Sequence, residues 1–250
     1  MSGTTAAAQH QGGERDEPPG SPAGDPGVPG DPGEPGEPGE PDELGAAGER
    51  HLSHLPVRPR ARGLLLALGG AVGLLASMVL TVERFRLATE PGYRPSCSVN
   101  PFISCQTVME SAQAALFGFP NPLLGIGAFA VSTTLGVLLL SGTALPRWVE
   151  RGHLLGIALG AVLVGWLVVQ ALFPIHALCP YCMLVWAVVV PTFWVSLADA
   201  LDRGLLPVPR ALRGAARAVV DFRVLLVVLT LAAIAAAVGV QFWSYWVTLL

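Results

Sequence analysis

The stretch "HALCPYCMLVW" (residues 176–186) lies where one long apolar run of the sequence ends and the next begins. It places Cys179 and Cys182 in a Cys-x-x-Cys pair at that boundary. Pro174 and Pro180 flank the junction, and because proline removes a backbone donor, they favour a turn over one continuous helix. The stretch therefore predicts two separate helices, with a pair of thiols where the second helix begins.

Long apolar runs dominate the chain on both sides of this junction. Hydrophobic residues make up 52% of the sequence, charged residues make up 13%, and the mean hydropathy is +0.56, which is more apolar than a soluble domain. Each run approaches the ~20 residues that a helix needs to cross ~30 Å of hydrocarbon, and none contains a charged side chain. The sequence thus predicts an all-α, multi-pass membrane helix bundle. Its runs are Leu64–Val82, Pro122–Gly142, Leu154–Phe173, Tyr181–Ala198 and Val224 to about Trp246.

Two segments outside these runs differ from them in composition. Residues 1–56 are rich in proline, glycine and acidic side chains, so they offer little apolar surface to offset the entropy of ordering. We expect a disordered tail there. Residues 201–223 carry several arginines, and we expect a basic loop between the fourth and fifth runs.

Arginine sets the expected orientation, because the chain contains no lysine. Cytoplasmic segments of membrane proteins carry the excess of basic residues. This predicts a cytoplasmic N-terminus, a cytoplasmic basic loop and a C-terminus on the outer face of the cell membrane. On the side predicted to be cytoplasmic are Arg58, Arg60, Arg62, Arg147, Arg151, Arg203, Arg210, Arg213, Arg217 and Arg223, whereas the other side has only Arg84, Arg86 and Arg94.

All four cysteines fall on the predicted outer side. Cys97 and Cys105 lie between the first two runs, and Cys179 and Cys182 begin the fourth. Two pairs in an oxidising compartment indicate disulfide chemistry. Several kinds of site remain open: structural disulfides in a transporter or assembly protein, a zinc site, or redox catalysis at the membrane surface.

The local chemistry favours redox catalysis among these alternatives. Structural zinc ligands normally lie in small polar loops, and an outer loop exposed to oxidation is a poor place for a zinc site. A thioredoxin-like motif requires a βαβ context, which the sequence lacks. In contrast, Cys179 would lie at a helix N-terminus, where unpaired amides and the helix dipole stabilise a thiolate. Cys182 would lie one turn deeper in the apolar layer.

Three motifs together resemble the bacterial branch of the vitamin K epoxide reductase family. They are "CSVNPFISC" (97–105), "SAQAALFGFPNPLLGIGAF" (111–129) and "CPYC" (179–182). The similarity covers roughly residues 64–198 and implies a four-helix catalytic core, here residues 57–200, with a fifth transmembrane helix at 224–250. The order of the cysteine pairs distinguishes this family from the DsbB family, whose Cys-x-x-Cys lies in the first outer loop.

The resemblance implies an electron relay from protein thiols to a membrane quinone. Cys97 and Cys105 match the family's loop shuttle pair, and Cys179 and Cys182 match the pair beside the quinone. The partner implied is a secreted, DsbA-like thioredoxin-fold protein, and we expect it to be a separate chain because no such domain follows the last helix. The acceptor implied is a lipid quinone, menaquinone or ubiquinone. Neither a metal nor a nucleic acid is expected.

The resemblance also assigns three residues to the quinone pocket. Ser111 matches the family's conserved serine, and Asn121 matches the asparagine that hydrogen-bonds a quinone oxygen. Trp186 stands where the vertebrate enzymes have a tyrosine, and an indole can donate a hydrogen bond but cannot accept one. From the residues alone, a helix cap is the favoured interpretation of Asn121, and the resemblance reverses that preference; Ser111 could cap the helix that follows it.

Overall fold

A computed structural model describes residues 59–100 and 102–243 of the chain. The acidic tail expected over residues 1–56 lies outside the described residues. So do the last residues of the expected fifth transmembrane segment, 244–250.

Within the described residues, five helices are long and apolar enough to cross a membrane, which confirms the predicted all-α membrane bundle. Shorter helices lie between α2 and α4 and between α6 and α8, and the described residues contain no named strand. The long helices are α2 (Pro59–Thr89), α4 (Asn121–Leu140), α5 (Arg147–Gln170), α6 (Pro180–Asp202) and α8 (Arg223–Gln241).

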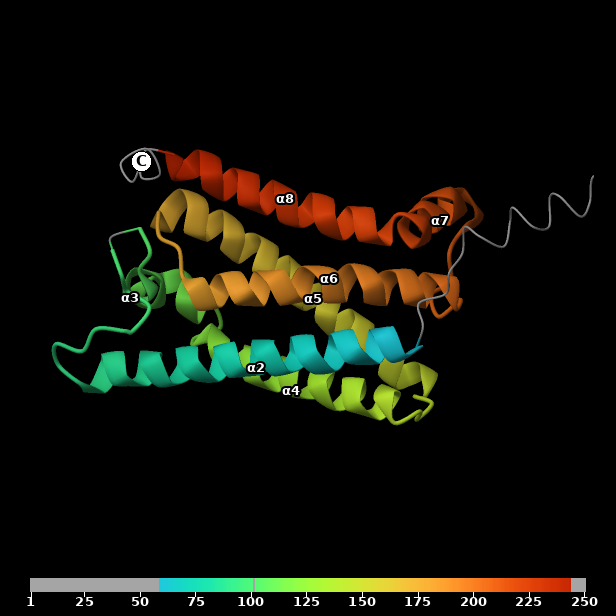
Figure 1. Ribbon diagram of the computed structural model, residues 1–250, viewed down its shortest axis with the longest axis horizontal. Coiled ribbons are helices and arrows are strands. Elements are labelled where there is room, and N and C mark those ends of the chain that lie inside the picture. The colour runs from blue at the N-terminus through green and yellow to red at the C-terminus, as the bar shows by residue number, and fades with distance from the viewer. Residues whose placement is uncertain (1–58, 101, 244–250) are drawn as a thin grey trace, which may run out of the picture. The chain divides into compact units, whose positions relative to one another are not determined.

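Helix α6 is the centre of the bundle, since it packs against α2, α5 and α8. Helix α4 packs closely along α2 but makes few contacts with α5. The short helix α3 (Cys105–Glu110) lies at the end of the bundle where α6 begins (Figure 1). We call this the cysteine end, and we call the other the opposite end.

Small residues bring α2 and α4 together. A Cβ atom on Gly136 would overlap the backbone of Ala67, and one on Gly70 would overlap Thr133. Close approach of backbones through glycine is the usual way for membrane helices to associate, because lipid supplies no hydrophobic drive between them. The α2–α4 pair is therefore a rigid wall of the bundle.

The junction of α5 and α6 forms a turn, although not where proline alone would place it. Helix α5 continues through one π-helical turn (Ala171–Ile175) that contains Pro174, and the chain reverses only at His176, in the left-handed conformation with φ 54°. A wider turn accommodates the missing proline N–H without ending the helix. The predicted separation of two helices is present, but Pro174 does not itself end α5.

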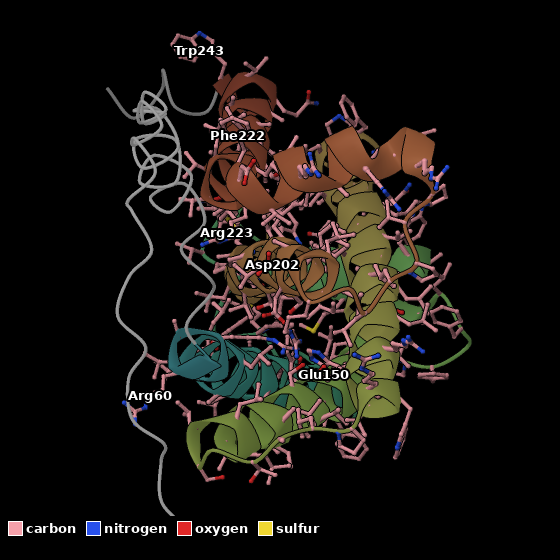
Figure 2. The ribbon with its side chains drawn as sticks, turned by 90° about the vertical axis from the view of Figure 1, so that its right-hand side faces the viewer. Arg60, Glu150, Asp202, Phe222, Arg223 and Trp243 are labelled. Atoms are coloured by element: carbon pink, nitrogen blue, oxygen red, sulfur yellow. A yellow bond between two sulfur atoms is a disulfide. The ribbon has the colours of Figure 1, made fainter. Side chains whose placement is uncertain are left out.

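A buried charge cluster joins three helices at the opposite end. Arg62 of α2 lies 3.1 Å from Glu150 of α5 and 3.0 Å from Asp199 of α6, and Arg203 donates to both carboxylates. Figure 2 labels Glu150, which lies among these helices. Arg62, Glu150 and Asp199 are buried, whereas Arg203 is partly exposed. Charges removed from water must be paired, so this neutral set of two arginines and two acids fixes α2, α5 and α6 relative to one another.

The segment between α6 and α8 is more regular than the expected loop. It contains a short 3₁₀ turn (Arg210–Leu212) and the helix α7 (Arg213–Asp221). The arginines at 210, 213 and 217 recur at helical spacing and are exposed. Such alternation of basic and apolar residues forms an amphipathic helix, a pattern that net charge alone does not reveal.

We expect Gly136→Ala to destabilise the bundle by about 1–3 kcal/mol, because the added methyl meets backbone atoms that cannot move aside. Thermal unfolding in detergent measures the effect. Gly165→Ala is the matched control, since a Cβ atom there meets nothing within 4 Å. Equal melting temperatures for the two variants would contradict the close packing of α2 and α4.

Candidate active site

The first cysteine pair forms a disulfide over the cysteine end of the bundle. Cys97 and Cys105 are bonded, with Cα atoms 5.6 Å apart. Cys105 is the first residue of α3, whose N-terminus is capped by the Ser104 hydroxyl accepting from the Thr107 N–H at 3.2 Å. Both cysteines are buried, Cys97 at 7% exposure and Cys105 at 0%.

A short parallel bridge fixes this loop to the start of α6. The Leu178 N–H donates to the Phe102 carbonyl at 2.7 Å, and the Ser104 N–H donates to the Leu178 carbonyl at 3.0 Å. The bridge therefore brings Cys105, which follows it in the loop, close to Cys179, which follows it at the start of α6. The Sγ atoms of Cys105 and Cys179 lie 3.2 Å apart, within reach for exchange between the two pairs.

The second pair begins α6, as the sequence predicts. Cys179 is the N-cap residue and is 2% exposed, and both Cys179 and Cys182 are free thiols. A hydrogen bond from the Cys182 thiol, with the backbone N–H groups of Cys182 and Tyr181, holds the pKa of Cys179 below its usual value, although burial acts in the other direction. The helix N-terminus thus favours a thiolate at Cys179.

Behind the second pair lies an apolar cavity of about 510 Å³, bordered by α2, α4, α5 and α6. Cys182 lines this cavity, and one helical turn deeper on the same face so does Trp186. Cys179, in contrast, packs among the loop cysteines and Met109. The two thiols of the pair therefore face different surroundings, one toward the loop disulfide and the other toward the cavity.

Asn121 lines the cavity at the start of α4. Its Nδ2 donates to the Gln113 carbonyl at 2.7 Å, and its Oδ1 accepts from the Leu116 N–H at 3.1 Å, so the orientation of the amide is fixed by both partners. The side chain makes no capping hydrogen bond to α4. It instead holds the turn before α4, and the second N–H of its amide is left to donate into the cavity.

Ser111 also lines the cavity, at the C-terminus of α3. Its hydroxyl donates to the Val108 carbonyl at 2.7 Å and makes no capping bond to the helical turn that follows. In this arrangement, its oxygen is left to accept a hydrogen bond but not to donate another.

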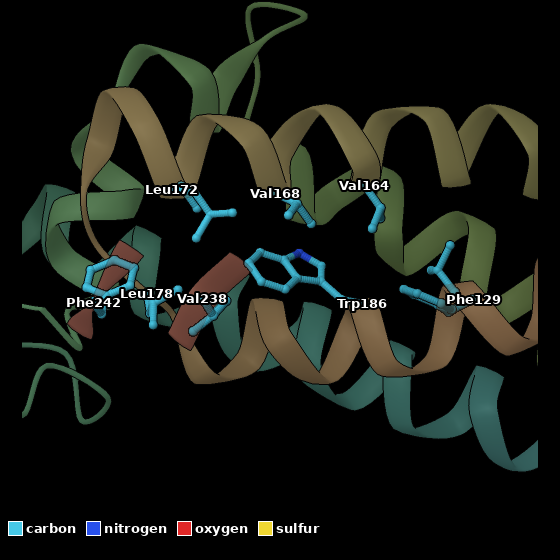
Figure 3. Packing of buried hydrophobic residues seen from close by; sticks show 10 residues of the cluster. Phe129, Val164, Val168, Leu172, Leu178, Trp186, Val238 and Phe242 are labelled. Carbon is cyan, nitrogen blue, oxygen red and sulfur yellow. The ribbon is translucent and has the colours of Figure 1, made fainter. Parts of the chain in front are cut away.

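Trp186 is 4% exposed and packs with Phe129 of α4 and Val164 and Val168 of α5. Figure 3 shows the indole extending from α6 toward Val168. Within the part of the chain that the structure describes, no group accepts the indole N–H, and the residue borders the cavity. An indole donor in this position is suited to an oxygen-bearing ligand.

The cavity opens sideways between α4 and α5. Gly127 of α4 and Gly156 of α5 both line it and are both exposed, and a Cβ atom on either would meet nothing within 4 Å. Because these helices cross the apolar layer, the opening faces lipid rather than water. A ligand with a long apolar substituent can therefore enter without passing through the polar loops.

The structure brings all the predicted site residues to the cysteine end, but it adds features that sequence reasoning missed. The bridge between Ile103 and Leu178 has no sequence signal, because it is made by backbone groups. Glu83 and Arg84 contact the segments that flank the disulfide. Their signal was present, since they are the first charged residues after the first apolar run.

The arrangement does not suit a zinc site of four cysteines, because two of them are consumed in a disulfide. Among residues 59–100 and 102–243, no three His, Cys, Asp or Glu side chains gather as metal ligands. Two cysteine pairs in contact, one of them beside a cavity, are suited to thiol–disulfide exchange.

Comparison with known proteins agrees with this chemistry. The model of the vitamin K epoxide reductase family matches residues 64–197, which run from the second turn of α2 to near the end of α6. No curated protein matches the chain. The match covers more than half of the sequence and includes all four cysteines, which supports a redox function. The chain belongs to the vitamin K epoxide reductase family.

Proposed function

We propose that this protein is a membrane thiol–disulfide oxidoreductase that reoxidises a secreted, DsbA-like thioredoxin-fold protein and passes the electrons to a membrane quinone. One observation carries the proposal. The loop disulfide lies 3.2 Å from Cys179, and the partner thiol of Cys179, Cys182, lines an apolar cavity. The sulfur atoms are thus ordered from the surface to the cavity.

Electrons enter at the loop pair. A thiolate of the protein partner attacks Cys97, the Cys97–Cys105 bond breaks, and Cys105 leaves as a thiolate. The partner's second thiol then releases Cys97, so the partner leaves as a disulfide and the loop pair holds two electrons. Cys179 occupies the other side of Cys105, which leaves Cys97 as the sulfur for an incoming thiol.

The second exchange passes these electrons inward. In the oxidised inner pair, Cys105 attacks Cys179 and Cys182 leaves as a thiolate. Cys97 then attacks Cys105, which restores the loop disulfide and releases Cys179 as a thiol. The described structure, with a loop disulfide and two free inner thiols, has the redox state that follows this step. A lowered pKa at Cys179 makes it a good leaving group.

The cavity fits a quinone by its chemistry. Its volume of about 510 Å³ lies within the range of small-molecule sites, and its walls are apolar apart from a few polar groups. Asn121 and Trp186 supply N–H donors, and Cys182 supplies the reducing sulfur. A bound quinone supplies the two-electron acceptor, while the protein supplies position, donors and exclusion of water. Menaquinone and ubiquinone are both two-electron acceptors with ring oxygens and a long apolar substituent, so either could suit this cavity.

The proposal places the cysteine end on the outer face of the cell membrane and the N-terminus in the cytoplasm. Arginine asymmetry supports this orientation, because the opposite end bears the exposed arginines of α7. A thiol partner secreted from the cell then lies on the same side of the membrane as the loop disulfide. The competing function, a transporter or assembly protein with static disulfides, gives no reason for a third sulfur to lie beside the loop disulfide.

The two pairs should divide the reaction between them. Cys182→Ala should abolish quinone reduction, because the thiol that lines the cavity is lost. Replacing Cys97 and Cys105 with serine should stop turnover with a reduced thioredoxin-fold partner but leave part of the reaction with dithiothreitol, which reaches the inner pair directly. Quinone absorbance measures both reactions. Complete loss of the dithiothreitol reaction in a folded loop-pair variant would contradict the shuttle role.

Asn121→Ala should slow quinone-dependent turnover by roughly tenfold to a hundredfold, because a donor to a quinone oxygen stabilises developing negative charge by about 1–3 kcal/mol. The variant also loses the bonds to the Gln113 carbonyl and the Leu116 N–H, so its melting temperature must be measured on the same sample. Near-normal turnover with a lowered melting temperature would make Asn121 purely structural.

Gly156→Leu should fill the side opening of the cavity. With a long-chain quinone, we expect turnover at limiting quinone to fall roughly tenfold, which corresponds to ~1.4 kcal/mol of lost binding. A short-chain analogue should be affected much less. Gly165→Leu, on the same helix but away from the cavity, is the control. An equal loss with both quinones would argue against entry between α4 and α5.

A further inference from the structure

Glu83 is a buried carboxylate at the cysteine end of α2 that the relay described above does not use. It is 8% exposed. Its Oε2 accepts from the Tyr93 hydroxyl at 2.7 Å, and its Oε1 accepts from the Ser96 hydroxyl at 2.8 Å. Burying a carboxylate is costly unless it is hydrogen-bonded, so each oxygen here is matched with a donor. Both donors come from the segment that leads into the loop disulfide.

The position of those donors ties Glu83 to Cys97. Ser96 directly precedes Cys97, and Tyr93 lies one short turn earlier, after Gly92 with φ 82°. We call residues 91–97 the Cys97 arm. The neighbouring Arg84 donates to the Met109 carbonyl in the last turn of α3, beyond Cys105. Two consecutive residues of α2 thus hold the segments on both sides of the disulfide.

Packing also holds the Cys97 arm, because Pro95 and Cys97 are buried and Arg86 lies over the Tyr93 ring, but few other hydrogen bonds join it to α2. Its backbone bonds are local, such as Tyr93 N–H to the Glu90 carbonyl and Ser98 N–H to the Pro95 carbonyl. On its other side is a polar hollow of about 700 Å³, lined in part by Tyr93 and Ser98. Packed protein does not fill that side. The bonds to Glu83 are the hydrogen bonds that join the arm to a buried residue of α2.

Cys105 is held by a different device. The bridge through Leu178 fixes residues 102–104, immediately before Cys105, to the start of α6. Neither of its hydrogen bonds involves the Cys97 arm. The two sulfurs of one disulfide are therefore anchored separately, one by a side chain of α2 and the other by the backbone before α6.

We propose that Glu83 is a positioning residue for Cys97. Its two hydrogen bonds hold Cys97 covered against Cys105. Their release lets the arm move and expose Cys97 to an incoming thiol, while the bridge keeps Cys105 beside Cys179. The consequence for turnover rests on the proposed function, but the positioning of Cys97 is a property of the loop pair alone.

The test uses the full-length protein with Cys179→Ala and Cys182→Ala, so that only the loop pair reacts. In glutathione buffers, each loop disulfide and two glutathione thiols are converted into two protein thiols and one glutathione disulfide. Adding Glu83→Ala should make the loop disulfide roughly tenfold easier to reduce at equilibrium, and reduced roughly tenfold faster, since two hydrogen bonds to a carboxylate are lost. Glu83→Gln, which keeps one acceptor oxygen, should be intermediate.

Matched variants separate positioning from general damage. Glu90→Ala removes an exposed acid at the same end of α2, where Glu90 pairs only loosely with Arg86 at 4.0 Å. It should change neither the equilibrium constant nor the rate constant for reduction of the loop disulfide. Tyr93→Phe combined with Ser96→Ala should reproduce Glu83→Ala while the carboxylate is kept. Melting temperatures of the reduced proteins verify folding.

Two results would overturn the proposal: a folded Glu83→Ala variant with both constants within roughly twofold of its parent, or an unchanged Tyr93 and Ser96 double variant. The proposed function fails differently. If the protein with all four cysteines does not transfer electrons from a reduced thioredoxin-fold protein to a quinone, that function is wrong, while the effect of Glu83 on the loop disulfide stands.

Discussion

The bridge between Ile103 and Leu178 is the constraint on which the site depends. Two backbone hydrogen bonds, from Leu178 N–H to Phe102 and from Ser104 N–H to Leu178, set the register of the disulfide loop against the start of α6. Each such bond contributes only about 1 kcal/mol to stability. Their importance is geometric, because a shift of one residue would turn Cys105 away from Cys179 and leave two unrelated cysteine pairs. With the register as it is, the pairs are in contact at 3.2 Å.

The start of α6 then makes the two thiols of the Cys-x-x-Cys pair unequal. Cys179, before the first turn, receives N–H groups that lower its pKa and faces the loop disulfide. Cys182 lies one turn along the helix, where it borders the apolar cavity with Trp186. A helix terminus placed at the edge of the apolar layer therefore separates the site into a half that faces the loop disulfide and a half that faces an apolar cavity. The same two residues inside a continuous helix would share one environment.

The sequence predicted the features that depend on local composition and missed those that depend on distant contacts. The apolar runs predicted five helices, because burial in lipid follows from side-chain type alone. The π-helical turn that accommodates Pro174 was missed, since proline usually ends a helix. The sequence favours Asn121 as a cap of α4, but its side chain bonds back to Gln113 and Leu116, and these partners come within reach only when the turn before α4 has folded. The roles of Glu83 and of the Leu178 bridge depend on segments brought together only by folding.

The cavity itself follows from an imbalance in helix packing. Glycines lock α4 against α2, so α4 cannot also close on α5. Polar contacts hold α4 and α5 at a fixed separation instead: Ser132 and His153 lie 3.1 Å apart toward the opposite end, and Gln113, before α4, donates to Gln170 of α5 at 3.3 Å toward the cysteine end. Between these two ties, exposed glycines leave space that no side chain fills. An apolar void in a bundle would normally collapse to regain packing. Here the rigid α2–α4 wall and the ties at both ends keep the space open beside Cys182.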